Sequence, residues 1–326
     1  MEIKQFDADI AKAARERGYF IMPKVDWLTV VFNDMTIMQV FEVFGIDSVF
    51  YADYEEVFSR RFDLSKGWCT KVCFMWQGVN IQVNRSELLE FDMDSEEAPK
   101  RFLDLKFTNI RFDMSATALA QVKRVSGFDV DSVIFKPLML MEDGSIDPRY
   151  HITRCDIAYD LVNYNPDFVY TLAELLRTCG NRQDRWGDYR VPVLGSTAAI
   201  KFQVCLGRER CVYLGATGSN RLLRVYDKKF EWEVKRKPLE KCPYTDILGK
   251  IPDSWIRIEL QLRRPETIHP ILYSDADFSK VFRYIYDTFA IVEGQGLRPD
   301  LRVSRVWTDL FDWSEIPGLI LNFYLG

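Results

Sequence analysis

The stretch Leu222–Lys228 carries the residues best suited to chemistry in this chain. Side chains alternate between the two faces of a strand, so Arg224, Tyr226 and Lys228 are predicted to share one face, with the apolar residues between them facing a core. Two cations beside a phenol can hold a phosphate, and the phenol oxygen can attack the phosphorus. The stretch therefore predicts Tyr226 as a nucleophile. The alternative is an ordinary half-buried strand with surface charges.

Two other stretches, Ile152–Leu161 and Trp255–Arg263, are predicted strands with one apolar and one charged face. The charged faces carry arginines and carboxylates: Arg154, Asp156 and Asp160 on the first, and Arg257, Glu259 and Arg263 on the second. Carboxylates on two strands, next to a tyrosine with cations on a third, suit a metal-assisted phosphoryl transfer. Each strand alone would be interpreted as an amphipathic edge. The coincidence of the three favours a catalytic site.

The order of these motifs resembles a known family. Arg-x-Asp-(x)3-Asp, Tyr-Leu-Gly, Arg-Val-Tyr-Asp-Lys and Arg-Ile-Glu-Leu follow one another between Arg154 and Arg263. This order is similar to that of the Rep_trans replication initiation factors, which are rolling-circle initiators of small plasmids and related relaxases of integrative and conjugative elements. The resemblance extends from about Asp26 to the region after Arg264.

The resemblance implies roles for individual residues. Tyr226 corresponds to the nicking nucleophile, and the acidic metal ligands correspond to Asp156, Asp160 and Glu259, which would hold Mg²⁺ or Mn²⁺. Two positions depart from the family pattern: Cys155 replaces a larger aliphatic residue, and Gln261 stands where a second acid often occurs. A metal site in this chain would therefore lack a fourth carboxylate.

Composition indicates a well-folded globular protein. The 326 residues are 48% hydrophobic and 14% aromatic, which excludes a disordered chain. No run approaches the roughly 18 uninterrupted apolar residues of a membrane span. The N-terminus lacks the apolar core of a signal peptide, so we expect a cytoplasmic protein. Two histidines and seven cysteines without a Cys-x-x-Cys pair argue against a zinc site or a disulfide framework.

Charge is unevenly distributed along the chain. The formal net charge is −5, yet residues 181–264 hold 18 Lys and Arg against 10 Asp and Glu, a local excess of +8. A local positive field is what a polyphosphate ligand requires. The alternative is a solvated charged surface. We expect DNA-binding arginines at positions that include Arg182, Arg185, Arg210 and Arg221. Arg154 and Arg257 either contact DNA as well or orient the neighbouring carboxylates.

The predicted fold class is α+β. We expect a central, mostly antiparallel sheet with helices on one face and an open face that receives single-stranded DNA, an arrangement the resemblance also implies. The expected organisation is a DNA-binding strand–helix half over residues 1–145, a catalytic half over 146–264 and a helical C-terminal appendage over 265–326. Candidate helices include residues 6–17 and 115–127, and a hairpin is expected around Gln77-Gly78.

These observations predict a DNA-nicking enzyme. Tyr226 would attack a phosphodiester, leaving a 5′-phosphotyrosyl link and a free 3′-OH, while Arg224 and Lys228 hold the scissile phosphate. The ligand would be single-stranded or hairpin origin DNA, with a host helicase and a second copy of the chain as candidate partners. Two alternatives remain: a metal-dependent hydrolytic nuclease, and a non-catalytic nucleic-acid-binding module that uses Tyr226 and Tyr213 for stacking.

Overall fold

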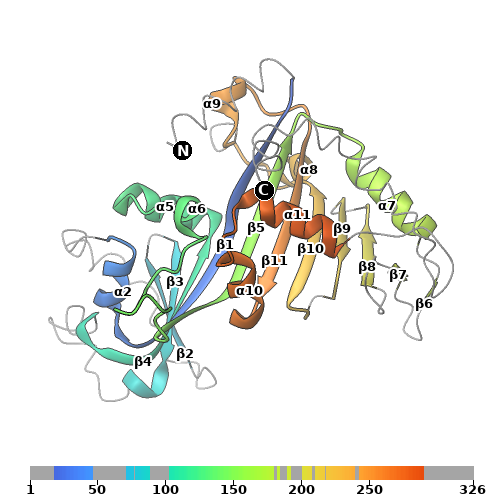
Figure 1. Cartoon of the computed structure of the whole chain (residues 1–326). Helices are drawn as coiled ribbons and strands as arrows, with labels where there is room; N and C mark the ends of the chain where they lie inside the picture. The colour runs from blue at the N-terminus through green and yellow to red at the C-terminus, as the bar shows by residue number, and fades with distance from the viewer. Residues whose placement is uncertain are drawn as a thin grey trace. The chain divides into compact units, whose positions relative to one another are not determined.

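The computed structural model describes ten stretches of the chain (Figure 1): residues 18–46, 71–76, 78–88, 103–179, 182–183, 189–191, 200–207, 210–216, 218–238 and 242–289. The expected helix over 6–17 lies outside these residues. The chain divides into two compact units. One unit comprises Met1–Lys24, Ile157–Gln261 and Ala276–Gly326, and the other comprises Val25–Asp156 and Leu262–Asp275. Among the described residues, no helix has the length and apolar character needed to cross a membrane.

The unit that contains Val25–Asp156 is built on strands in the order β2-β3-β4-β1. Their bounds are β1 (Phe20–Thr36), β2 (Lys71–Trp76), β3 (Val79–Asn84) and β4 (Lys106–Ser115). Each neighbouring pair is antiparallel. The β2–β3 hairpin turns at Gly78, whose φ of +83° suits glycine. The hairpin expected around Gln77-Gly78 is therefore confirmed.

Helices cover the apolar face of this sheet. They are α2 (Ile37–Val43), α5 (Ala116–Ser126), the single turn α6 (Val130–Val133) and α10 (Pro265–Leu272), with a 3₁₀ turn at Arg85–Leu88. Phe41 of α2 packs on Phe112 of β4 with ring centroids 6.0 Å apart. Ser115 caps α5 and Gly127 ends it in the left-handed conformation, as the sequence predicts. The N-cap of α2 is Thr36, which forms a capping box with Gln39 at the point where β1 ends.

The opposite face of the β1–β4 pair is polar. Thr29 and Asp113 lie directly opposite each other, and the Thr29 hydroxyl donates to the Asp113 carboxylate at 2.5 Å. Arg111 donates to both oxygens of the same carboxylate at 3.0 Å each. The predicted α+β fold, with a mostly antiparallel sheet and helices, is confirmed in this unit.

The unit that contains Ile157–Gln261 has strands in the order β5-β11-β10-β9-β8-β7-β6. They are β5 (Tyr150–Val162), β6 (Arg182–Gln183), β7 (Tyr189–Val191), β8 (Ile200–Cys205), β9 (Cys211–Leu214), β10 (Arg221–Asp227) and β11 (Trp255–Arg263). The pairs from β6 to β10 are antiparallel. Its helices are α7 (Phe168–Cys179), α8 (Lys228–Val234), α9 (Thr245–Leu248) and α11 (Phe278–Thr288). Strands β1, β5 and β11 contribute residues to both units.

Tyr159 on β5 packs against α11. Its ring centroid lies 4.6 Å from that of Phe282, and its hydroxyl donates to the Phe278 carbonyl at 2.5 Å. The apolar side of α11 is part of the core, since Val281, Phe282 and Ile285 are buried. Because neighbours alternate along a strand, Asp160 points to the other face of β5.

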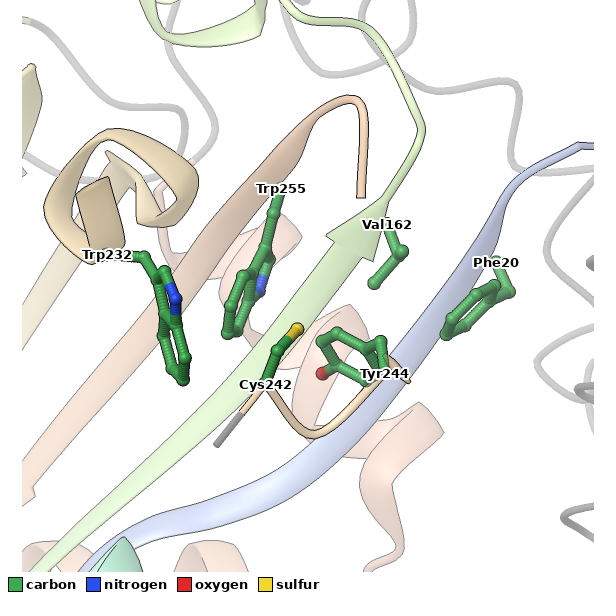
Figure 2. Packing of buried hydrophobic residues seen from close by; sticks show 6 residues of the cluster. All are labelled: Phe20, Val162, Trp232, Cys242, Tyr244 and Trp255. Atoms are coloured by element: carbon green, nitrogen blue, oxygen red, sulfur yellow. The ribbon is translucent and has the colours of Figure 1, made fainter. Parts of the chain in front are cut away.

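An aromatic cluster covers one end of the face of β5 that carries Asp160 (Figure 2). Its members come from the start of β1, the end of β5, α8, the segment before α9 and the start of β11: Phe20, Val162, Trp232, Cys242, Tyr244 and Trp255. Tyr244 and Trp255 are in edge-to-face contact at 5.1 Å. On β5, Val162 lies two residues after Asp160, and on β11, Trp255 lies two residues before Arg257. The cluster therefore lies beside these two charged groups and removes them from water.

Candidate active site

The strand β10 is held between β11 and β9. It pairs with β9 so that Arg224 lies opposite Tyr213 and Tyr226 opposite Cys211. Leu223 and Val225, which alternate with the charged positions, are completely buried. The turn into β10 depends on Gly215, where a Cβ atom would lie 2.8 Å from the Arg221 carbonyl oxygen and φ is +108°. The strand predicted from the sequence is confirmed.

The Tyr226 hydroxyl lies between an acid and a base. It donates a hydrogen bond to Glu259 Oε2 on β11 at 3.1 Å, and it accepts one from Lys228 Nζ at 3.3 Å. Tyr226 is 3% exposed and Glu259 is 5% exposed, so both groups are largely shielded from water. A phenol in this position has a carboxylate ready to take its proton and an ammonium group ready to stabilise the phenolate oxygen.

Lys228 reaches this position from a different element than the sequence indicates. It was expected on the strand, on the same face as Arg224 and Tyr226, but it is the first residue of α8. The helix starts there because Asp227 is its N-cap, with the side chain accepting from Phe230 N at 2.8 Å. The Lys228 side chain still turns back to the Tyr226 hydroxyl. The predicted proximity holds, and the predicted strand geometry at Lys228 was wrong.

The Arg224 guanidinium covers the Tyr226 ring. Its Cζ lies 4.1 Å from the ring centroid, and its Nη1 lies 3.7 Å from Glu259 Oε1. Burial alone would lower the pKa of Arg224, but the charges of Glu259 and Tyr226 outweigh that effect and raise it. Its Nε is buried without a hydrogen-bond partner, while 33% of the side chain is exposed. Arg224 therefore carries a permanent positive charge, and its Nε can still donate a hydrogen bond to a ligand.

Asp160 is enclosed by donors. Arg257 donates to it twice, from Nε at 2.5 Å and from Nη2 at 2.8 Å, and Lys24 Nζ lies 2.8 Å from its Oδ2. The Tyr244 hydroxyl donates to the same Oδ2 at 2.5 Å. Burial would raise the pKa of Asp160, but the charges of Arg257 and Lys24 hold it far below its usual range. Burial and the nearby carboxylate raise the pKa of the Tyr244 phenol well above its usual value.

This environment bears on two of the site predictions. The lone pairs of Asp160 that a metal ion would need are already engaged by four hydrogen bonds or ion pairs, which favours a structural role for this carboxylate. Arg257 is 3% exposed and donates to Asp160, so its charge is not presented to a DNA phosphate in this structure. The alternative role considered for Arg257, orienting a carboxylate, matches its geometry.

Asp156 lies in the other unit and is paired with Arg154. Arg154 Nε donates to both Asp156 oxygens at 3.0 and 3.2 Å, and Nη2 donates to Oδ2 at 2.5 Å. The Arg154 guanidinium also stacks on Trp27, 4.5 Å from the ring centroid. Asp156 is 1% exposed. Arg154 therefore orients a buried carboxylate while resting on an aromatic ring.

The predicted metal ligands do not fit a preformed cation site. No group of three His, Cys, Asp or Glu side chains is gathered for a metal ion among the residues that the structure describes. Asp160 is enclosed by Arg257, Lys24 and Tyr244, and Asp156 is held by Arg154. Glu259 is engaged by Tyr226 and Arg224 instead.

The arginines predicted to contact DNA have varied surroundings. Arg210 is paired with Asp227 at 3.1 Å and stacks on Phe230 at 4.0 Å. Arg221 is exposed at the start of β10, 5.5 Å from the Tyr284 ring. Arg182 belongs to β6, and Arg185 lies outside the described residues. Among the members of this set whose side chains the structure describes, Arg221 has the clearest exposed charge.

Three residues at this site were not predicted: Lys24, Tyr244 and Glu231. Glu231 accepts from Lys228 at 2.5 Å, and the three-residue spacing of the two on a helix was a usable signal. Lys24 and Tyr244 meet Asp160 from positions far away in the chain, so no local pattern indicated them.

The family model for Rep_trans, described as a replication initiation factor, matches residues 150–316, which is more than half of the chain. A comparison with curated proteins found no match. A solved structure described as the rolling circle replication initiator protein from Geobacillus stearothermophilus is 15% identical, with a TM-score of 0.48. That alignment covers 89% of this chain and 94% of the other.

Proposed function

The chain belongs to the Rep_trans family of replication initiation factors, and from this premise we propose that it nicks one strand of origin DNA through Tyr226. The observation that carries the proposal is the placement of the Tyr226 hydroxyl between Glu259 at 3.1 Å and Lys228 at 3.3 Å. A structural tyrosine needs one hydrogen-bond partner when buried. This hydroxyl has a proton acceptor and a cation, which is the environment of an activated nucleophile.

The proposed step is a transesterification. The Tyr226 oxygen forms a bond to phosphorus as the bond from phosphorus to the 3′ oxygen breaks. The Tyr226 proton passes to Glu259, and the departing 3′ oxygen takes a proton from water to become a free 3′-OH. The product is a 5′-phosphotyrosyl link, which conserves the phosphodiester and can be reversed without ATP.

Arg224 and Lys228 would stabilise the negative charge of the reaction. Lys228 already donates to the attacking oxygen, so it is placed to stabilise the phenolate. Arg224 covers the Tyr226 ring and keeps an unused Nε donor. We propose that a DNA phosphate draws the Arg224 guanidinium away from the Tyr226 ring. The guanidinium then binds the phosphate, and its movement lets the phosphate reach the Tyr226 hydroxyl.

The resemblance also implies Mg²⁺ or Mn²⁺, which would neutralise the non-bridging oxygens of the phosphate. The arrangement of the carboxylates leads us to divide their roles. We propose that Asp160 is structural and that Glu259 accepts the proton of Tyr226. Asp156, paired with Arg154, remains a carboxylate that could be released to a cation when that arginine moves.

The proposed function is tested with 3′-labelled single-stranded oligonucleotides that tile the DNA on both sides of the gene for this chain, incubated with the full chain and Mn²⁺. Denaturing electrophoresis should show a labelled band that resists SDS and disappears after protease treatment. Cleavage without such a band would replace the proposal with a hydrolytic nuclease. Binding without cleavage would replace it with a nucleic-acid-binding module.

A second expectation concerns where the DNA lies. Arg182 and Arg221 belong to the segment with the +8 excess, so replacing both with Gln should weaken binding of single-stranded DNA. Each lost phosphate contact should also flatten the dependence of log affinity on log salt by about 0.7. Fluorescence anisotropy at several salt concentrations measures both quantities. The matched control replaces two exposed arginines outside the segment, Arg124 and Arg177, and should change neither. Equal slopes for the two variants would contradict this DNA path.

A further inference from the structure

Lys228 is held against Tyr226 by a residue that the proposed reaction has not used. Glu231 lies one turn further along α8 and accepts from Lys228 Nζ through Oε2 at 2.5 Å. The same ammonium group donates to the Tyr226 hydroxyl at 3.3 Å. Only 13% of the Lys228 side chain is exposed. A single nitrogen therefore joins the nucleophile to a carboxylate on the helix.

The geometry of α8 explains this contact. The helix begins at Lys228, immediately after β10. Residues three or four apart on a helix lie on one face. Lys228, Glu231 and Lys235 follow one another along that face, and Lys235 Nζ pairs with Glu231 Oε1. Each oxygen of Glu231 thus has a different lysine. The carboxylate is fixed from both sides, and its position fixes Lys228.

The Glu231 carboxylate is ionised at neutral pH. Burial would raise its pKa, but hydrogen bonds from Lys228 and Lys235, together with their charges, lower it to about 2. A free lysine side chain has several rotatable bonds, and ordering it costs up to roughly 2 kcal/mol of conformational entropy. A charged acceptor beside the lysine offsets that cost before DNA arrives.

We propose that Glu231 is a positioning residue that holds the Lys228 ammonium group on the Tyr226 oxygen. This inference rests on the proposed role of Tyr226 as nucleophile and assigns that reaction a residue which touches neither DNA nor the reacting atoms. Glu231 acts by restricting Lys228, so the ammonium is already in place when the phenolate forms. Such preorganisation affects the chemical step and not the binding of DNA.

The chain offers a matched control on the same helix. Glu233 lies two residues beyond Glu231 and is 58% exposed at its side chain, with Lys229 Nζ 4.0 Å away. Both glutamates belong to α8 and pair with a lysine, but the Glu233 pair does not include a lysine that contacts Tyr226. Replacing either with Gln removes one negative charge from the helix. Only the Glu231 change releases Lys228.

The experiment compares the full-length wild type with Glu231→Gln, Glu233→Gln, Lys228→Met and the Lys228→Met/Glu231→Gln double variant. The rate of formation of the SDS-resistant adduct is measured over a range of concentrations of the 3′-labelled oligonucleotide. Glu231→Gln should lower the rate at saturating oligonucleotide about tenfold, the effect of one charge-assisted hydrogen bond. The concentration that gives half of that rate should stay close to the wild type, while the Tm should fall, because ionised Glu231 also stabilises the fold through its two lysines. Glu233→Gln should match the wild type in all three.

The double variant tests the route of the effect. If Glu231 acts through Lys228, adding Glu231→Gln to Lys228→Met should cause no further loss of rate. Additive losses, equal rates for Glu231→Gln and Glu233→Gln, or a faster reaction in Glu231→Gln would each overturn the inference. These outcomes leave the nucleophile untouched, because the wild type still forms the adduct. Absence of an adduct from the wild type itself would overturn the proposed function and this inference together.

Discussion

Replacing Tyr226 with Phe should abolish the covalent protein–DNA adduct while DNA binding stays close to that of the wild type. The Phe ring fills the same space beneath Arg224 but has no oxygen to attack phosphorus. Removal of a nucleophile lowers enzymatic rates on the order of 10⁴-fold or more. The measurement is the SDS-resistant band from the 3′-labelled oligonucleotides, with binding followed by fluorescence anisotropy.

A second tyrosine provides the control for this variant. Tyr213 stands on the neighbouring strand β9, directly opposite Arg224, and is half-buried. Tyr213→Phe should retain the adduct at nearly the wild-type rate, because the nucleophile and its partners are unchanged. An adduct from Tyr226→Phe, or its loss in Tyr213→Phe alone, would assign the nucleophile elsewhere. Thermal melting of both variants shows whether each is folded.

Replacing Asp160 with Asn should destabilise the fold severely. The change removes the Asp160 charge from beside the buried Arg257 guanidinium and weakens the contacts with Lys24 and Tyr244. Removing one partner of a buried ion pair costs about 3–5 kcal/mol. A Tm lowered on the order of 10 °C is the expected result in calorimetry or circular dichroism.

The control for Asp160 is an aspartate of the same unit with a surface ion pair. Asp253 is 75% exposed at its side chain and pairs with Lys250, so Asp253→Asn should melt close to the wild type. Asp160→Asn with an unchanged Tm but a higher requirement for Mn²⁺ in adduct formation would restore Asp160 as a metal ligand. A lower Tm with an unchanged Mn²⁺ requirement would support the structural role.

The pH dependence of stability follows from the same ion pair. The pKa of folded Asp160 lies far below that of an unfolded aspartate, so its ionised form stabilises the fold. This contribution is complete above the ordinary aspartate pKa of about 4 and is lost as the pH falls below it. The wild type should therefore lose stability in acid more steeply than Asp160→Asn. Melting curves between about pH 3 and 7 measure the difference.

Local patterns in the sequence were sufficient for the strands and several of their ends. Alternation of apolar and charged residues predicts β10 and β11, because the two faces of a strand meet different surroundings. Ser115 and Gly127 predict both ends of α5, since one caps the N-terminus and the other adopts a left-handed backbone. The motif order around Tyr226 indicated the family, and the family model matches that region. These features depend on neighbouring residues alone.

The tertiary structure decided what each charge does. Arg257 and Arg224 are arginines on the adjacent strands β11 and β10. The aromatic cluster covers Arg257, whereas a third of the Arg224 side chain is exposed. Aspartate is a common metal ligand, but the Asp160 carboxylate is bound by Lys24 and Tyr244, which are remote from it in the chain. Lys228 was placed by the cap at Asp227, which starts a helix where alternation alone predicts a strand. Burial and long-range partners determine whether a charge binds a ligand or holds the fold, and neither is encoded in local spacing.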